Sequence, residues 1–191
     1  MIELKLKRTL LRLDFSFFAA VSLFLFLDGS GFGMAAMCAC GLHELSHLII
    51  MTAFGIVPDA VTFYGAGIRI SSERIEYTKL HTRLLVLAAG CLANFAAAAL
   101  LWLFGEYEAS AINLFTGIFN MLPLGELDGA ALLKILLIKK CRPENIDRYM
   151  KTAWMVSAAV IASAIFISGG DVSFTLITTA LYIMVMCGSR V

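Results

Sequence analysis

The chain has few charged residues and few prolines. Asp, Glu, Lys and Arg make up 15% of its 191 residues, whereas a soluble domain carries about 25%. Hydrophobic residues reach 60%, above the roughly 45–50% of soluble domains. This composition excludes an ordinary soluble domain and indicates an integral membrane protein. The net charge of +1 gives no indication of a nucleic-acid partner, and none is expected.

The cysteines do not form the pattern of a disulfide-bonded protein. There are five, an odd number, and four of them lie in or beside apolar runs, so we expect reduced thiols. Two of these, Cys38 and Cys40, precede His43 by one to two helical turns. Without a third partner they make a weak ligand set, and packing is the better interpretation. The five are Cys38, Cys40, Cys91, Cys141 and Cys187.

Six apolar runs predict an all-α polytopic membrane protein with six transmembrane helices. The fourth run is short, so we expect a broken helix that continues at residues 130–138. We expect one domain over residues 1–191, with an uncleaved first helix because no cleavage site follows it. The predicted spans are residues 10–27, 33–54, 84–104, 111–124, 153–168 and 172–187.

The basic residues are confined to alternate connections. All 15 Lys and Arg lie before or at the start of the first run, between the second and third or the fourth and fifth, or after the sixth. The other three connections carry only acidic residues: Asp28, then Glu106 and Glu108, then Asp171. By the positive-inside rule, both termini are expected in the cytoplasm.

The connection after the second run changes from a helical to an alternating pattern. Apolar residues alternate on either side of a glycine-containing turn, which predicts a short β-hairpin. Either it is a surface loop, or its edge binds an extended peptide by strand addition. The residues of the second hypothesis are Val61, Phe63, Tyr64, Gly65, Gly67 and Ile68.

A His-Glu-Leu-Ser-His sequence lies inside the second apolar run. On a helix, His43 and His47 project from one face with Glu44 beside them. Two imidazoles at this spacing hold zinc in metalloproteases, and the glutamate acts as general base. A charged group near the bilayer centre costs roughly 2.5–3.5 kcal/mol, so this cluster is unexpected in a helix that only faces lipid. The sequence therefore predicts zinc-dependent hydrolysis within a membrane.

A catalytic zinc site needs a third protein ligand, and the interrupted fourth segment offers one. Pro123 and Gly125 break the helical pattern before Asp128, and Gly129 follows it directly. Asp128 is either this ligand or the N-cap of the following helix. In the third run, Asn94 is the one polar group; it either bridges helices or supports a zinc ligand or the oxyanion.

These motifs together resemble the site-2 protease family of intramembrane metalloproteases. They are His43-Glu44-x-x-His47, Gly90-x-x-x-Asn94, and Asn120-x-x-Pro123 followed by Leu127-Asp128-Gly129, and the six-span layout is most similar to the compact bacterial sporulation-type branch. The resemblance implies that His43, His47 and Asp128 bind one Zn²⁺ ion and that Glu44 is general base and acid. It places Asn94 and Asn120 near the metal.

The resemblance also implies a substrate and a location. The substrate is a single-span or membrane-associated protein cleaved in regulated intramembrane proteolysis, and a membrane regulatory partner is compatible with it. We expect a bacterial cytoplasmic membrane, an active site toward the cytoplasmic side, and neither a PDZ nor a nucleotide-sensing domain. Glu126 departs from the family pattern, which often has proline there.

The sequence has two alternative interpretations besides a protease. A metal or solute transporter needs a polar path to both faces, but no Asp, Glu, Lys, Arg or His lies between Asp28 and His43. A catalytically inactive membrane scaffold would be expected to have lost Glu44 or a ligand, and all are present.

Overall fold

The structure, a computed structural model, describes residues 1–6, 8–28, 31–65, 67–125 and 127–167. It divides into two compact units, Met1–Ile118 and Phe119–Val191. The predicted sixth span, residues 172–187, lies outside the described residues, and so does Glu126.

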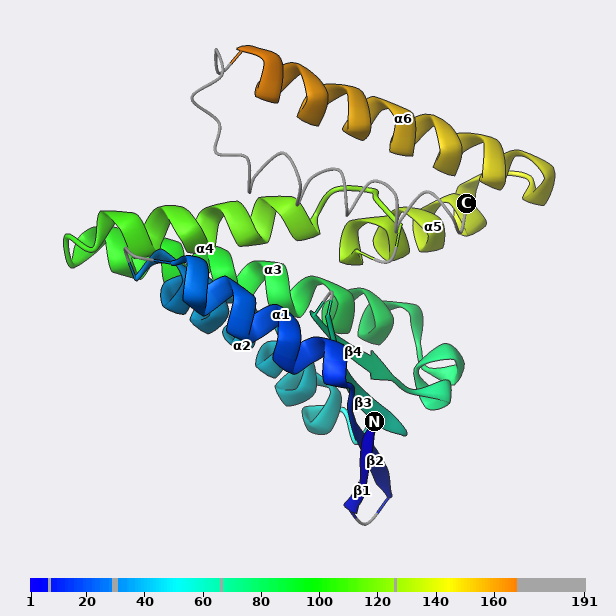
Figure 1. The fold of residues 1–191 in the computed structure, drawn as a ribbon. Coiled ribbons are helices and arrows are strands. Elements are labelled where there is room, and N and C mark those ends of the chain that lie inside the picture. The colour runs from blue at the N-terminus through cyan, green and yellow to red at the C-terminus, as the bar shows by residue number, and fades with distance from the viewer. Residues whose placement is uncertain (7, 29–30, 66, 126, 168–191) are drawn as a thin grey trace. The chain divides into compact units, whose positions relative to one another are not determined.

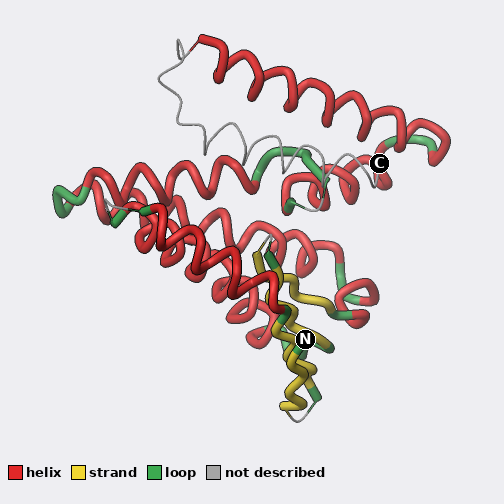
Figure 2. The backbone as a smooth tube through the Cα atoms, in the orientation of Figure 1, coloured by secondary structure: helices red, strands yellow, loops and turns green. Residues whose placement is uncertain are grey.

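The first unit combines a small sheet with long helices (Figures 1 and 2). Helix α4 begins in this unit and ends just beyond its boundary. In chain order the elements are β1 (Ile2–Leu6), β2 (Thr9–Leu13), α1 (Phe15–Leu27), α2 (Phe32–Ala53), β3 (Ala60–Tyr64), β4 (Gly67–Ser71), the 3₁₀ helix η1 (Glu73–Tyr77), α3 (Leu80–Leu103) and α4 (Tyr107–Asn120).

The four strands form one sheet in the order β1-β2-β3-β4. The described residues are mostly helical, as predicted, and the predicted hairpin is present as β3 and β4. The N-terminal residues form a second hairpin that was not predicted. In β1, Ile2, Leu4 and Leu6 alternate with Glu3 and Lys5, which is the period of a strand. Strand β2 then pairs in parallel with β3, far along the chain, so that β3 is hydrogen-bonded on both sides.

The helices pack on this sheet and on one another. Helices α2 and α3 are in extensive contact, and Met51 and Val86 from these helices are buried with Ile56. Ile70 of β4 packs against this core. Phe17 of α1 meets Phe63 of β3 edge-to-face, with 5.3 Å between ring centroids. The sheet is therefore fixed to the helices that carry the predicted site.

Among the described residues, only α2 and α3 are both long and apolar enough to cross a membrane. Helix α1 has 13 residues and is therefore about 20 Å long, shorter than the predicted first span. The first span was predicted to begin at residue 10, but residues 9–13 form strand β2, and the helix begins only at Phe15. The arrangement of six spans stays a prediction.

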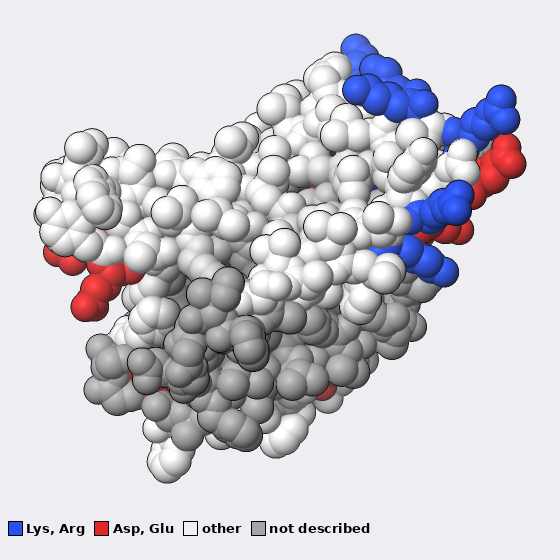
Figure 3. Space-filling model, turned by 90° about the horizontal axis from the view of Figure 1, so that it is seen from above, with Lys and Arg blue, Asp and Glu red and all other residues white. Residues whose placement is uncertain are grey.

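The second unit contains α5 (Asp128–Lys140) and α6 (Pro143–Ile167). The predicted interruption is present, since α4 ends at Asn120 and α5 begins at Asp128. A Cβ at Gly129 would overlap the Met121 carbonyl, so the glycine permits this tight connection. Apart from Asp128 at the start of α5, the charged residues of the two helices lie in the second half of α5 and the first half of α6. Figure 3 shows basic side chains gathered toward one end of the face in view.

Candidate metal site

Helix α2 brings His43 and His47 together. They lie four residues apart on its buried face and are 3% and 7% exposed. Their Nε2 atoms are 3.1 Å apart, and the rings meet edge-to-face. The two imidazoles therefore converge on one point through the same ring atom.

The opposite ring nitrogens face fixed hydrogen-bond partners. His47 Nδ1 lies 2.7 Å from the Val86 carbonyl oxygen, which only accepts hydrogen bonds, so His47 carries its proton on Nδ1. His43 Nδ1 lies 2.8 Å from Asn94 Oδ1 and donates to it in the same way. Both Nε2 atoms are then unprotonated, and they face one another.

This donor set fits a zinc ion. Two ligand nitrogens at tetrahedral Zn–N distances of 2.0–2.1 Å would be roughly 3.3 Å apart, close to the 3.1 Å observed. Two facing lone pairs repel unless a cation or a proton lies between them. The geometry of His43 and His47 thus meets the requirement for two of the ligands.

Gly90 allows α3 to pass over the two imidazoles. A Cβ at Gly90 would lie 2.6 Å from the Nε2 atoms of both His43 and His47. Gly90 and Asn94 are four residues apart and share a face of α3. One face of this helix therefore provides both the space above the rings and the partner of His43.

Glu44 and three cysteines lie on α2 and α3, the helices that form the surroundings of the two histidines. Glu44 follows His43 on α2 and is half-buried. Cys38 and Cys40 are exposed, whereas Cys91 is buried, and its Sγ lies within 4.8 Å of a ring nitrogen of His43. Sequence reasoning missed Cys91; its only signal was its position directly after Gly90.

The remaining predicted site residues lie in the second unit. Asn120 is the last residue of α4, and Pro123 is in the connection that follows. Asp128 is the first residue of α5, and the N-cap position is held by Leu127. The N-cap interpretation of Asp128 is therefore wrong by one residue, and the ligand role stays a prediction.

The predicted peptide-binding hairpin has one edge strand. Val61 is buried on β3, which is paired with β2 and β4, so of the two strands of this hairpin it is β4 that lies at an edge of the sheet. The turn is held on α1, because the Gly65 N–H donates to the Ser16 hydroxyl at 3.0 Å. Arg69 stacks over the Tyr64 ring at 5.2 Å. Of the predicted contact residues, Gly67 and Ile68 lie on the edge strand.

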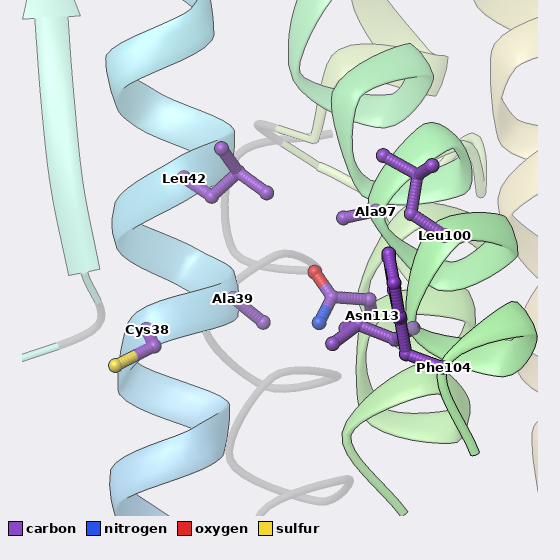
Figure 4. Close-up of a pocket in the computed structure, with 8 residues that line it drawn as sticks. Cys38, Ala39, Leu42, Ala97, Leu100, Phe104 and Asn113 are labelled. Atoms are coloured by element: carbon purple, nitrogen blue, oxygen red, sulfur yellow. The ribbon is translucent and has the colours of Figure 1, made fainter. Parts of the chain in front are cut away.

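A cavity of about 350 Å³ lies beside the metal-site helices (Figure 4). Its walls are apolar side chains of α2 and α3, and Asn113 of α4 is the polar residue among them. The lining residues are Cys38, Ala39, Leu42, Ala97, Leu100, Leu101, Phe104 and Asn113.

No family model and no curated protein matches the chain. Among solved structures it is similar to a site-2 protease from Methanocaldococcus jannaschii, with a TM-score of 0.69 and 19% sequence identity. The match covers 98% of this chain and 94% of that chain. Over nearly its whole length, the chain therefore has the fold of a site-2 protease.

Proposed function

We propose that the chain is an intramembrane zinc metalloprotease of the site-2 type. The observation that carries this proposal is the pair of Nε2 atoms, 3.1 Å apart and with Nδ1 partners fixed, on an apolar helix that also carries Glu44. The shared fold supports the same reaction class. We place the protein in a bacterial cytoplasmic membrane, with the site toward the cytoplasmic side.

The chemistry follows from the donor set and its neighbour. A zinc ion bound there would supply Lewis-acid activation of water and of the scissile carbonyl. Glu44 would accept the proton of the attacking water and deliver it to the leaving amide nitrogen. Gly90 and Asn94 would hold the imidazoles in the orientation that the ion requires.

We propose Asp128 as the third ligand. A carboxylate suits zinc, and a catalytic site needs three protein ligands. Cys91 is the competing donor, because its sulfur lies beside His43. Purified Asp128→Asn protein should lose most of its zinc, while Cys91→Ala should retain a full complement, as measured by elemental analysis. The reverse result would assign the ligand to Cys91.

The proposed substrate is a single-span or membrane-associated protein. A helical amide has its backbone groups occupied, so the segment to be cleaved must become extended. Strand β4 offers the sheet edge on which an extended segment pairs, from Gly67 onward. A membrane-bound regulatory partner is compatible with this arrangement.

Coexpression with candidate single-span substrates tests the reaction. The wild-type chain should cleave at least one, and Glu44→Gln should lose cleavage by at least about a hundredfold, as expected when a general base is removed. Glu44→Gln should still bind zinc, because Glu44 is not a ligand in this proposal. Equal cleavage by both chains would refute the hydrolase.

A further inference from the structure

The two histidines are held at Nδ1 by partners of different kinds. His47 faces a backbone carbonyl, which only accepts, whereas His43 faces a side-chain amide, which has a donor end and an acceptor end. A reversed Asn94 amide would present N–H to His43. His43 would then carry its proton on Nε2 and would lose the lone pair that points toward the metal position.

Two acceptors hold the Asn94 amide in its observed orientation. Asn94 Nδ2 donates to the Ala39 carbonyl at 3.0 Å and to Asn113 Oδ1 at 3.0 Å. A reversed amide would set its oxygen against both of these oxygens. Asn94 is 0% exposed, so bulk water does not compensate for that loss.

Asn113 is oriented in turn by its own helix. Its Nδ2 donates to the Ala109 carbonyl, one turn earlier on α4, at 2.9 Å. This bond directs Asn113 Oδ1 toward Asn94. These hydrogen bonds therefore form a chain in which every donor faces the same way. His43 donates to Asn94, and Asn94 donates to Asn113. Asn113 donates to a backbone carbonyl of α4.

We propose that Asn113 is a positioning residue of the metal site. It fixes the Asn94 amide, which keeps the His43 proton on Nδ1 and leaves Nε2 unprotonated for the metal. Asn113 touches neither the metal position nor a substrate. The inference rests on the proposed metal site but does not require that the protein be a protease.

The same arrangement makes the site depend on the docking of α4. Asn113 borders the apolar cavity between α2 and α3 (Figure 4). Close by, Ser110 of α4 donates to the Ala98 carbonyl of α3 at 2.7 Å, which holds the two helices together without joining the amide chain. Ser110 therefore supplies a control residue on the same helix interface.

The experiment compares the full-length wild-type chain with Asn113→Leu, Asn113→Thr and Ser110→Ala. Leucine has a similar size and no polar atom; threonine keeps a hydroxyl that donates to the i−4 carbonyl and accepts from a neighbour. Histidine-labelled, metal-free protein is examined by nitrogen-15 NMR, which reads the tautomer of each imidazole. The chain has three histidines, so the spectrum is simple. Zinc affinity is measured by chelator competition.

In the wild type and in Ser110→Ala, we expect His43 as the Nδ1–H tautomer. In Asn113→Leu, the Nε2–H tautomer of His43 should appear while His47 stays unchanged. Removing a residue that hydrogen-bonds to a metal ligand lowers metal affinity roughly 10–100-fold. Asn113 bonds to Asn94 and not to the ligand itself, so for Asn113→Leu we expect zinc affinity to fall by only about threefold to tenfold. Asn113→Thr should recover part of this loss.

The inference is overturned if Asn113→Leu and Ser110→Ala have the same His43 tautomer and zinc affinity. It is also overturned if wild-type His43 is already protonated on Nε2. If Asn113→Leu does not fold, Asn113→Thr is compared with Ser110→Ala instead, and equal His43 tautomers and equal zinc affinities in these two variants overturn the inference. A wild-type chain that binds zinc but cleaves nothing contradicts the protease and leaves the inference intact.

Discussion

At Gly90 the side chain has to be absent for the metal site to exist. The imidazoles of His43 and His47 occupy the space that a Cβ would take. Replacing a helical glycine by alanine normally stabilises a helix by about 0.5–1 kcal/mol. At Gly90 the steric conflict with both rings should exceed that gain.

Gly90→Ala should therefore lower zinc affinity by at least about tenfold, the lower bound for disturbing ligand orientation. Chelator competition on purified protein measures it. Gly41→Ala on α2 is the matched control, because a Cβ there meets nothing within 4 Å. Similar affinities for the two variants would show that α3 shifts without disturbing the rings.

The sequence predicted the ligand pair because both histidines and Glu44 belong to one local pattern. Asn94 was predicted as a supporting residue because it is a lone polar group on an apolar helix. Its partner Asn113 was not predicted, because a contact between α3 and α4 is not encoded in any local spacing. Cys91 was predicted only as a reduced thiol, because its proximity to His43 is likewise a contact between two helices.

At the scale of elements, the sheet differs most from the prediction. The β3–β4 hairpin was predicted from its alternation and its glycines, which are local signals. The β1–β2 hairpin carries a similar alternation, but its basic residues were interpreted only as flanks of a span. The parallel pairing of β2 with β3 joins residues about 50 positions apart and has no local signal.

Proline in β2 tests the importance of this pairing. Leu11 lies on a strand paired on both sides, so Leu11→Pro removes a ladder hydrogen bond and should destabilise the sheet. We expect a lower melting temperature and faster proteolysis in the loop after β4. Ile2→Pro, at the first residue of edge strand β1, should be tolerated. Equal stability of both variants would contradict a structural role for the sheet.

At the scale of the whole molecule, sheet pairing constrains membrane topology. Strand β2 precedes α1, and β3 follows α2, yet the two strands are adjacent. The chain between them is therefore expected to cross the membrane an even number of times. If α2 crosses, the segment that contains α1 is expected to cross in the opposite direction, which agrees with the distribution of basic residues.

Reporter fusions test the orientation. A reporter that is active only outside the cytoplasm should be active after Ser30 or Glu108 and silent after Thr78 or Arg142. These positions alternate between acidic and basic connections, so the positive-inside rule predicts opposite results. Activity after Thr78 would overturn the predicted topology.

The parallel β2–β3 pair also dictates an order of events during synthesis. Residues 9–13 leave the ribosome well before residues 60–64, by on the order of several seconds at 5–20 residues per second. During that interval the N-terminal hairpin stands alone, and an isolated two-stranded hairpin is at best marginally stable in water. If α1 and α2 both insert into the membrane, the sheet can close only when residues 60–64 have returned to the side that residues 9–13 occupy. In that case, sheet closure depends on correct insertion of both helices.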